Sequence, residues 1–389
     1  MFIASPNHKT SYILESSSDM AGMRQSDRWL IALVVLLMVA GMLAVYSSIA
    51  YFAEMKNTTA ASLVFGHLMK VGISFIVLVI FSKIDYHIVA RLARIGVILS
   101  WIFLAVVTLY GNEVFGARRY LSIGGLSFQP SSFATVALLI LVVVLVVEKK
   151  DYIKSFTRAF LPTLTWISIT CLLIGIEDFS SAAVLFGLSL IIMFIGRASV
   201  VQLSALVVVG ILGAGFLLSQ SLERQSRINN YVEQVVEIKS DEFVLGAGYQ
   251  AQQAHIAIAR GGTFGVGIGK STQRDFLPAP YNDFIYAIIA EEYGLLGAGF
   301  ILLVFMGILI RGIVFIARKA PDELGMLIAV ACTLTVVIYG FVNAAVACGL
   351  FPVTGLPMPF VSYGGTSMLF SGAMIGILLN ISKQAVDIE

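Results

Sequence analysis

Long apolar runs, separated by short polar connections, constrain this chain more than any other feature of its sequence. Hydrophobic residues make up 58% of it and charged residues only 12%, whereas a soluble protein averages about 25% charged residues. A helix that crosses a membrane needs about 20 predominantly apolar residues, and ten runs approach that length. They are 29–52, 64–81, 95–109, 132–147, 160–176, 182–195, 200–218, 284–310, 324–347 and 362–381. The sequence therefore predicts an all-α polytopic membrane protein with ten transmembrane helices.

Lysine and arginine are distributed unevenly over the connections between these runs. One set of connections is rich in basic residues, for example Arg91 and Lys150. The short loops of the opposite set hold little beyond Lys56, Arg118 and Arg119. Cytoplasmic loops of membrane proteins carry an excess of positive charge. We therefore expect both termini in the cytoplasm and Arg118 on the outer side.

This orientation divides the chain into three parts. Residues 1–28 form a cytoplasmic tail that lacks the apolar core of a signal peptide. Residues 29–382 form the ten-helix domain, in which a large extracytoplasmic loop, 219–282, separates helices 7 and 8, and residues 383–389 form a cytoplasmic tail. The net charge of +2 gives no argument for nucleic acid as a partner, and the three cysteines lack the CxxC spacing of a zinc site.

Three carboxylates stand at the mouth and in the first turns of the eighth run, at Asp283, Glu291 and Glu292. An ionisable side chain in a membrane segment is costly and marks a functional site by default. Asp283 is the candidate catalytic residue, and helix capping is an alternative role that is compatible with catalysis. Glu291 and Glu292 lie about two turns deeper, where Lys70 and His67 are candidate partners.

The outer loop before Asp283 contains a glycine-rich segment, GGTFGVGIGKS, at 261–271. It fails the P-loop template because Phe264 stands where the first glycine belongs. Alternating glycines would still let backbone N–H groups converge on a diphosphate, with Lys270 adding charge; the alternative is a turn packed on the bundle. Glycines also interrupt the next run, so 284–310 is either a tilted helix or one broken near Gly294.

Residues 246–260 place apolar and polar side chains at helical spacing, which predicts a short amphipathic helix at the outer interface. Its polar side bears Gln250, Gln253 and Arg260. Amides and arginine suit contacts with sugar and phosphate. The alternative is a helix that only lies on lipid.

Two further outer loops carry unusual residues. Arg118 and Arg119, on the side poor in positive charge, suit an anionic headgroup, with pairing to Asp178 as the alternative. Residues 350–367 contain three prolines within eight residues, which forbids a regular helix. Non-helical backbone at membrane depth needs a cover of protein or a water-filled cavity. We therefore expect a re-entrant segment that lines an outer cavity; an interhelical cap is the alternative.

Four segments together resemble one known family, the SEDS proteins (shape, elongation, division and sporulation), and its FtsW branch more than its RodA branch. They read GARRYLSIGGLSFQPSS at 116–132, YQAQQAHIAIARGGTFGVGIGKSTQRDFLP at 249–278, DFIYAIIAEEYGLLG at 283–297 and GLFPVTGLPMPFVSYGGTS at 349–367. The resemblance implies a peptidoglycan glycosyltransferase that polymerises lipid II at the periplasmic face of the bacterial inner membrane. It also implies a class B penicillin-binding protein as partner, alongside other membrane proteins of division or elongation. The family's essential aspartate falls on Asp283.

The chain departs from the family pattern in the second of its outer loops. Ser132 and Thr135 stand where the family has a glutamate and a lysine. Roles of that pair therefore do not carry over, and a metal-binding carboxylate beside Asp283 loses support. A divalent cation, Mg or Mn, would assist at a diphosphate, but the sequence names no ligand for it.

The resemblance implies a glycosyltransferase whose substrates are lipid II and lipid-linked glycan. In this hypothesis each candidate residue has a role. Asp283 acts as general base on the acceptor hydroxyl. Arg118, Arg119 and Lys270 hold the diphosphate. The remaining substrate-binding candidates are Gln129, Gln250, Gln253, Arg260 and Ser362. The rival hypotheses are a lipid II flippase or other transporter, and a non-catalytic scaffold for cell division.

Overall fold

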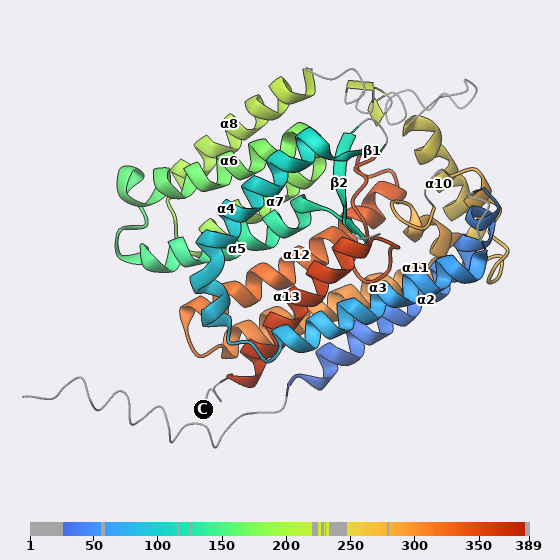
Figure 1. The fold of residues 1–389 in the computed structure, drawn as a ribbon, viewed down its shortest axis with the longest axis horizontal. Helices are drawn as coiled ribbons and strands as arrows, with labels where there is room; N and C mark the ends of the chain where they lie inside the picture. The colour runs from blue at the N-terminus through green and yellow to red at the C-terminus, as the bar shows by residue number, and fades with distance from the viewer. Residues whose placement is uncertain are drawn as a thin grey trace, which may run out of the picture.

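The structure is a computed structural model that describes residues 26–55, 59–114, 117–123, 126–219, 225–226, 229, 231–232, 247–277 and 280–385. Long helices run side by side through the molecule, and a small sheet lies at one end of them (Figure 1). The helices are α2 (Arg28–Met55), α3 (Ala60–Phe81), α4 (Tyr86–Tyr110), α5 (Pro130–Glu148), α6 (Leu161–Glu177), α7 (Phe179–Ile195), α8 (Val200–Ser219), α10 (Ala247–Gly261), α11 (Ile285–Ile310), α12 (Glu323–Ala347) and α13 (Gly365–Lys383). The short helical turns are η2 (Lys150–Tyr152), η3 (Phe156–Phe160), η4 (Gln273–Asp275), η5 (Arg311–Ile316) and η6 (Ala317–Lys319).

Eight helices in the described ranges are long and apolar enough to cross a membrane. Two shorter apolar helices, Phe179–Ile195 and Val200–Gly215, accompany them. The prediction of an all-α polytopic membrane protein is therefore confirmed, whereas the number ten and the position of the large outer loop stay predictions. Within that loop, residues 220–224, 227–228, 230, 233–246 and 278–279 lie outside the described residues, as do 1–25 and 386–389 of the two predicted tails.

Helix α4 begins at Tyr86, well before the start expected at residue 95. Asp85 caps it, since its side chain accepts a hydrogen bond from the backbone N–H of His87 at 3.0 Å. Hydropathy alone missed this turn because Arg91 and Arg94 interrupt the apolar pattern without interrupting the helix.

Helix α13 lies at the centre of the bundle and packs closely on α3. A Cβ at Gly372 would stand 2.5 Å from the carbonyl oxygen of Ser74, and one at Gly376 would stand 2.5 Å from that of Leu78. Glycines spaced four apart let the backbones of membrane helices approach each other closely. Since α13 is largely buried and α3 mostly exposed, α3 forms an outer layer over α13.

The segment between α12 and α13 is non-helical and covered by protein, as its prolines predicted. Phe360 and Val361 are fully buried. A Cβ at Gly41, near the middle of α2, would stand 2.6 Å from the carbonyl oxygen of Phe360. The segment therefore re-enters the bundle to mid-helix depth, where irregular backbone survives only inside protein or beside water.

The loop after α4 forms a small antiparallel sheet that the sequence analysis did not anticipate. Strands β1 (Asn112–Val114), β2 (Ala117–Ile123) and β3 (Leu126–Phe128) pair in the order β1-β2-β3. Figure 1 shows β2 at the end of α4, above the re-entrant segment. The sheet packs through β2 against α4, α5 and α6.

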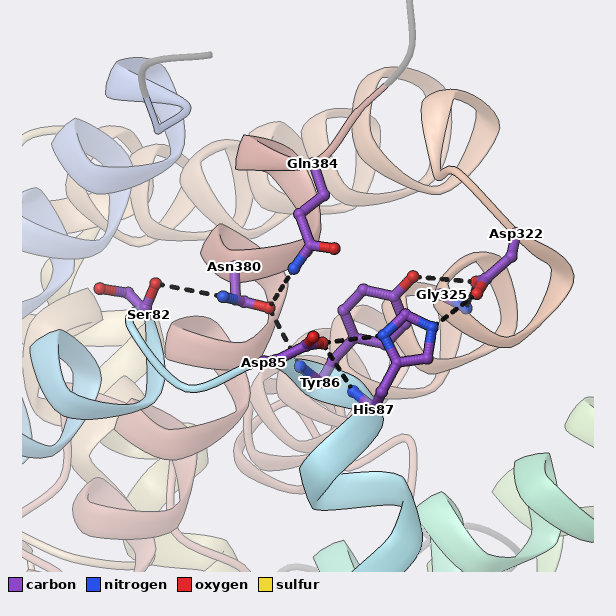
Figure 2. A network of polar contacts seen from close by, with 8 residues as sticks. All are labelled: Ser82, Asp85, Tyr86, His87, Asp322, Gly325, Asn380 and Gln384. Atoms are coloured by element: carbon purple, nitrogen blue, oxygen red, sulfur yellow. Dashed lines mark hydrogen bonds and ion pairs between the residues drawn. The ribbon is translucent and has the colours of Figure 1, made fainter. Parts of the chain in front are cut away.

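A polar network fastens the opposite end of the bundle (Figure 2). The ring of His87 lies between two carboxylates, with Nδ1 2.8 Å from Asp85 Oδ1 and Nε2 2.9 Å from Asp322 Oδ2. The Tyr86 hydroxyl donates to Asp322 at 3.0 Å, and the Tyr86 N–H donates to the side-chain oxygen of Asn380 at 3.1 Å. The connection between α3 and α4 is thus tied to the start of α12 and the end of α13.

Candidate active site

Asp283 lies in the turn that leads into α11 and is half-buried. The side-chain amide of Asn282 donates to Asp283 Oδ1 at 2.8 Å. The cap position of α11 belongs to Phe284, which makes no side-chain cap hydrogen bond. Helix capping therefore does not account for the carboxylate of Asp283.

The main chain of Asp283 is held by a buried amide on α12. The side chain of Asn343, 1% exposed, donates to the carbonyl oxygen of Asp283 at 2.9 Å and to that of Leu356 at 2.8 Å. A buried polar group in a membrane protein is costly unless it is paired. Asn343 thereby joins three elements: α12, the turn before α11 and the re-entrant segment.

The re-entrant segment binds the same turn through two further hydrogen bonds. The Ser362 hydroxyl donates to the carbonyl oxygen of Asn282 at 2.6 Å, and it accepts the N–H of Met358 at 2.8 Å. The backbone N–H of Tyr363 donates to the carbonyl oxygen of Tyr281 at 3.0 Å. Ser362, predicted to touch substrate, is 1% exposed and supports the turn instead.

Arg119 on β2 provides a cation on the same side of Gly355 as Asp283. Arg119 Nη1 and Asp283 Oδ2 each lie 3.6 Å from the point where a Cβ on Gly355 would stand. Arg119 Nε donates to the carbonyl oxygen of Glu177 at 3.2 Å, which fixes the guanidinium. Arg118 is described only through its backbone, which pairs with Glu113 in the sheet.

Asp178, the alternative partner of these arginines, has a structural role in α7. Its carboxylate accepts the N–H of Ser181 at 3.2 Å and the Ser181 hydroxyl at 2.7 Å. It is 5% exposed, so it is a buried cap of that helix. Arg119 instead binds the backbone one residue earlier, at Glu177.

The phenol of Tyr120 shares the electrostatic environment of this site. Burial and, after it, the charges of Asp283 and Asp178 raise the pKa of Tyr120 to about 12, with Arg119 opposing them. Burial likewise raises the pKa of Tyr281 above its usual value, with Tyr363 and Asp283 adding to the effect. Both phenols are therefore neutral at physiological pH and can donate hydrogen bonds to an oxygen of a substrate.

Lys70 reaches the same corner of the molecule from α3. Its Nζ lies 3.4 Å from the centre of the Tyr363 ring and 3.4 Å from the Tyr363 carbonyl oxygen. The His67 ring stacks on Tyr363 from the same helix. A Cβ at Gly364 would stand 3.5 Å from Asn282 Oδ1, so this corner adjoins the turn that carries Asp283. The sequence signal for Lys70 was a cation in an apolar span.

The glycine-rich loop is docked on a break in α11. Gly294 has φ 68° and ψ −169° inside the helix, which confirms the break as the correct alternative. The N–H groups of Val266 and Gly267 donate to the carbonyls of Glu291 and Glu292 at 2.9 and 3.1 Å. These two amides serve backbone groups that the break leaves without helical partners, so they are not open to an anion.

Glu291 and Glu292, just before this break, bind two different neighbours: the loop 271–273 and helix α2. Glu291, fully buried, accepts the Ser271 hydroxyl and the N–H groups of Thr272 and Gln273, the latter two at 3.2 and 3.3 Å. Glu292 accepts the hydroxyl of Ser47 on α2. Both carboxylates therefore support the loop and its contact with α2, whereas Lys70 and His67 lie against Tyr363.

The remaining candidates divide between two places. Arg260 donates to the Thr272 hydroxyl and lies 4.0 Å from Glu291, and Lys270 folds over Gly267. Both are thus beside the break, about 12 Å along α11 from Asp283. Gln250 and Gln253 are half-buried on α10, whose helix the sequence predicted. Gln129 precedes α5, and its N–H donates to the hydroxyl of Thr366 at 3.2 Å.

The divalent cation expected at the diphosphate has no ligand set that the described side chains identify. Among the residues that the structure describes, no group of three His, Cys, Asp or Glu side chains is close enough to bind one. The Arg119 guanidinium and Asp283 Oδ2 lie on the same side of Gly355, each 3.6 Å from the point where a Cβ would stand. Mg²⁺ is usually held by one or two carboxylates together with waters and substrate phosphates, so a divalent cation at the diphosphate stays a prediction, and no step below is routed through it.

The chain is similar to several known proteins over nearly its whole length. It is 33% identical to stage V sporulation protein E of Bacillus subtilis over 361 residues, which cover 92% of this chain and 97% of that protein. It is 31% identical to the probable peptidoglycan glycosyltransferase FtsW of Trichlorobacter lovleyi, with 92% and 93% covered.

Two solved structures share the fold. A chain from work on "structural coordination of polymerization and crosslinking by a peptidoglycan synthase complex" superposes with a TM-score of 0.70 at 22% identity and covers 92% of this chain and 98% of its own. The rod shape determining protein RodA of Thermus thermophilus gives 0.66 at 21%, with 93% and 98% covered. A family model described as "Cell cycle protein" (FTSW_RODA_SPOVE) matches residues 27–387. The chain therefore belongs to the FtsW/RodA/SpoVE family of cell cycle proteins, the membrane proteins whose role is in cell-wall synthesis.

Proposed function

We propose that the protein is a peptidoglycan glycosyltransferase that polymerises lipid II into β-1,4-linked glycan. The observation that carries this proposal is the setting of Asp283, a half-buried carboxylate whose main chain is bound by Asn343 and whose Oδ2 lies, like the Arg119 guanidinium, beside Gly355. Support also comes from relatives named as probable peptidoglycan glycosyltransferases.

In this reaction, Asp283 is the general base. The 4-hydroxyl of the acceptor GlcNAc forms a bond to C1 of the donor MurNAc, and the bond from C1 to the diphosphate oxygen breaks. The hydroxyl proton moves to Asp283, and the electron pair leaves with undecaprenyl diphosphate, with inversion at C1. General-base catalysis contributes about 10²–10⁴-fold.

Three side chains divide the other tasks. The Asn282 amide orients Asp283 Oδ1, and Oδ2, which lies beside Gly355, receives the proton. Arg119 stabilises charge that develops on the departing diphosphate. Tyr120, neutral because of its raised pKa, donates a hydrogen bond to a sugar or phosphate oxygen.

The proposed setting is the bacterial inner membrane, with both termini in the cytoplasm and Asp283 on the periplasmic face. The donor carries its own leaving group, so the reaction needs no nucleotide on that side. The fold shared with a chain of a synthase complex supports a class B penicillin-binding protein as partner, within the membrane assemblies of division or elongation.

The test is polymerisation by the purified full chain in liposomes that already carry lipid II on the outer leaflet. We expect glycan ladders on a gel from the wild type and a loss of about 10²-fold or more in Asp283→Asn. Asp151→Asn, exposed on η2 at the opposite end, is the matched control and keeps full activity. A flippase would move lipid II without forming glycan, and a scaffold would leave growth of cells carrying Asp283→Asn normal.

A further inference from the structure

Helix α12 binds the turn that carries Asp283 through the side chain of Asn343. Tyr339 stands four residues earlier on this helix, and therefore on the same face. Helix α12 packs against α5 and α7, which also pack against each other (Figure 1). Tyr339 and Thr135 of α5 line the same small cavity in this region. The Tyr339 hydroxyl has no part in the proposed reaction, but its contacts lead towards the candidate site.

The Tyr339 hydroxyl joins three helices. It is hydrogen-bonded to the hydroxyls of Thr135 on α5 and Ser181 on α7. Thr135 already donates its proton to the carbonyl oxygen of Ser131 at 2.9 Å. Ser181 already donates its proton to Asp178 Oδ2 at 2.7 Å. A hydroxyl has only one proton to give, so Tyr339 is the donor to the two hydroxyl oxygens.

This junction is buried. Thr135 is 3% exposed, Ser181 4% and Asp178 5%. In a protein interior a hydrogen bond is stronger than in water, and a polar group that loses its partner is costly. The junction at Tyr339 therefore fixes the start of α7 relative to α12.

The start of α7 is also the place where Arg119 is bound. Asp178 caps α7, and its carboxylate accepts both the N–H and the hydroxyl of Ser181. Glu177, the residue before this cap, accepts a hydrogen bond from Arg119 Nε on its carbonyl oxygen at 3.2 Å. A shift of this turn would therefore move the guanidinium that lies beside Gly355.

Two residues of α12, about one turn apart, thus support the two halves of the candidate site. Asn343 binds the main chain of Asp283. Tyr339 supports, through Ser181 and the cap of α7, the carbonyl oxygen that binds Arg119. We propose that Tyr339 is a positioning residue that holds the Arg119 guanidinium where it stabilises the departing diphosphate, a role that rests on the proposed function.

The test is the steady-state kinetics of polymerisation by the purified full-length Tyr339→Phe variant in liposomes that carry lipid II. We expect kcat and kcat/KM to fall together by about tenfold, a part of the effect of a misplacement of about 1 Å. KM should stay unchanged, because Arg119 acts on charge that develops only in the transition state. Wild-type kinetics in this variant, or a rise in KM alone, would overturn the proposal.

Tyr86→Phe is the matched control for this substitution. It also removes a tyrosine hydroxyl that donates to a neighbour, here Asp322 at 3.0 Å, but at the opposite end of the bundle. Its kinetics should equal those of the wild type. If Tyr86→Phe and Tyr339→Phe lose activity equally, the loss reflects weakened packing in general and contradicts a specific role for Tyr339.

A double-mutant cycle with Arg119 separates positioning from other effects. Arg119→Gln alone should lower kcat about 10²–10³-fold, the usual effect of removing one group that stabilises charge in the transition state. Tyr339→Phe added to that variant should cause no further loss, because the guanidinium that it positions is gone. A further loss as large as in the wild-type background would mean that Tyr339 acts by another route.

Ser181 tests the same junction from α7. Ser181→Ala removes the hydroxyl that accepts from Tyr339 and should lower kcat by a similar factor, whereas Ser181→Thr keeps a hydroxyl and should retain activity. Equal losses in these two variants would show that the hydroxyl does not position Arg119. Absence of glycan from the wild type would overturn the proposed function and this role with it, whereas an active wild type with a fully active Tyr339→Phe overturns this role alone.

Discussion

Asp283 depends for its position on groups that bind its main chain. Asn343 is the residue that sequence analysis had no means to identify, because an asparagine on an apolar helix has no local signature. It donates to Asp283 and to Leu356, which lies on the re-entrant segment far along the chain. Arg119, in contrast, was predicted from its pairing with Arg118 on a side poor in positive charge.

Asn343→Leu should reduce glycan synthesis about 10²-fold, because a misplacement of about 1 Å at a reacting group has that effect. It also leaves two buried carbonyl oxygens without this donor, at about 1–3 kcal/mol each. Polymerisation and thermal unfolding of the purified variant measure the two effects. The control is Thr335→Val, which removes a buried hydroxyl that bonds only within α12 and should leave activity intact. Wild-type synthesis by Asn343→Leu would show that the turn does not need this amide.

Gly355→Ala should lower polymerisation more than stability. Gly355 has φ +71°, and an added methyl group would lie 3.6 Å from both Arg119 and Asp283. The left-handed backbone costs an alanine about 1–2 kcal/mol, and the methyl occupies space that the substrate needs. Gly299→Ala, in open space on α11, is the comparison for both assays. If the two alanine variants polymerise equally well, the space beside Gly355 is not used by substrate.

The sequence predicted the length of helix α11 and the break as one of two alternatives, but it did not predict what docks on that break. Its apolar length was plain, and Gly294 marked the break as one of two alternatives. The docking of residues 262–267 on that break was not foreseeable, because it consists of main-chain hydrogen bonds between separate segments. The glycines that suggested an anion cradle are needed there for close approach of backbone. A Cβ at Gly265 would stand only 2.1 Å from the Glu292 carbonyl oxygen.

Gly265→Ala and Gly269→Ala form a pair that isolates this contact. Both glycines have positive φ, +84° and +75°, so both variants carry the same backbone strain of about 1–2 kcal/mol. Only Gly265 faces a backbone atom, while Gly269 faces open space. We expect Gly265→Ala to lower the melting temperature further and to impair polymerisation, with Gly269→Ala nearly active. Equal melting temperatures would mean that the loop is not tightly docked.

Other elements were missed for physical reasons that differ from case to case. The early start of α4 lies in a polar turn, and hydropathy detects only the apolar part of a helix. The strands β1 to β3 are only 3, 7 and 3 residues long, which is too short for an alternation of apolar residues to reveal them. The re-entrant segment was predicted because its prolines exclude a regular helix, and irregular backbone at membrane depth needs a cover of protein or a water-filled cavity.

At the scale of the whole molecule, the sequence predicted an apolar helical bundle but not which helices touch. Partner choice depends on small residues at particular faces, such as Gly372 and Gly376 where α13 meets α3. That contact also brings Lys70 on α3 to Tyr363 at the start of α13. The packing of the bundle and the geometry around the candidate site are therefore linked.

Gly372→Ala should destabilise the protein by about 1–3 kcal/mol, the usual cost of overpacking. Its Cβ would stand 2.5 Å from the Ser74 backbone. Gly187→Ala on α7 has nothing within 4 Å and should be neutral or gain up to about 1 kcal/mol, since alanine is the better helix former. Unfolding in detergent, followed by helical circular dichroism, compares the two. If the two variants are equally stable, the close approach of α3 and α13 does not contribute to the stability of the protein.

Because α11 is interrupted at Gly294, its first nine residues form a short helical segment that can pivot about the break. This segment is about 14 Å long from Gly294 to its first residue, and Asp283 lies just before that residue. A swing of about 10° would carry the carboxylate roughly 2 Å, enough on the scale of catalytic misalignment to change turnover by orders of magnitude. A displacement of the glycine-rich loop 262–267, which is docked on the break, would therefore lower or raise the rate of polymerisation from a distance. It would do so without any contact with sugar or diphosphate.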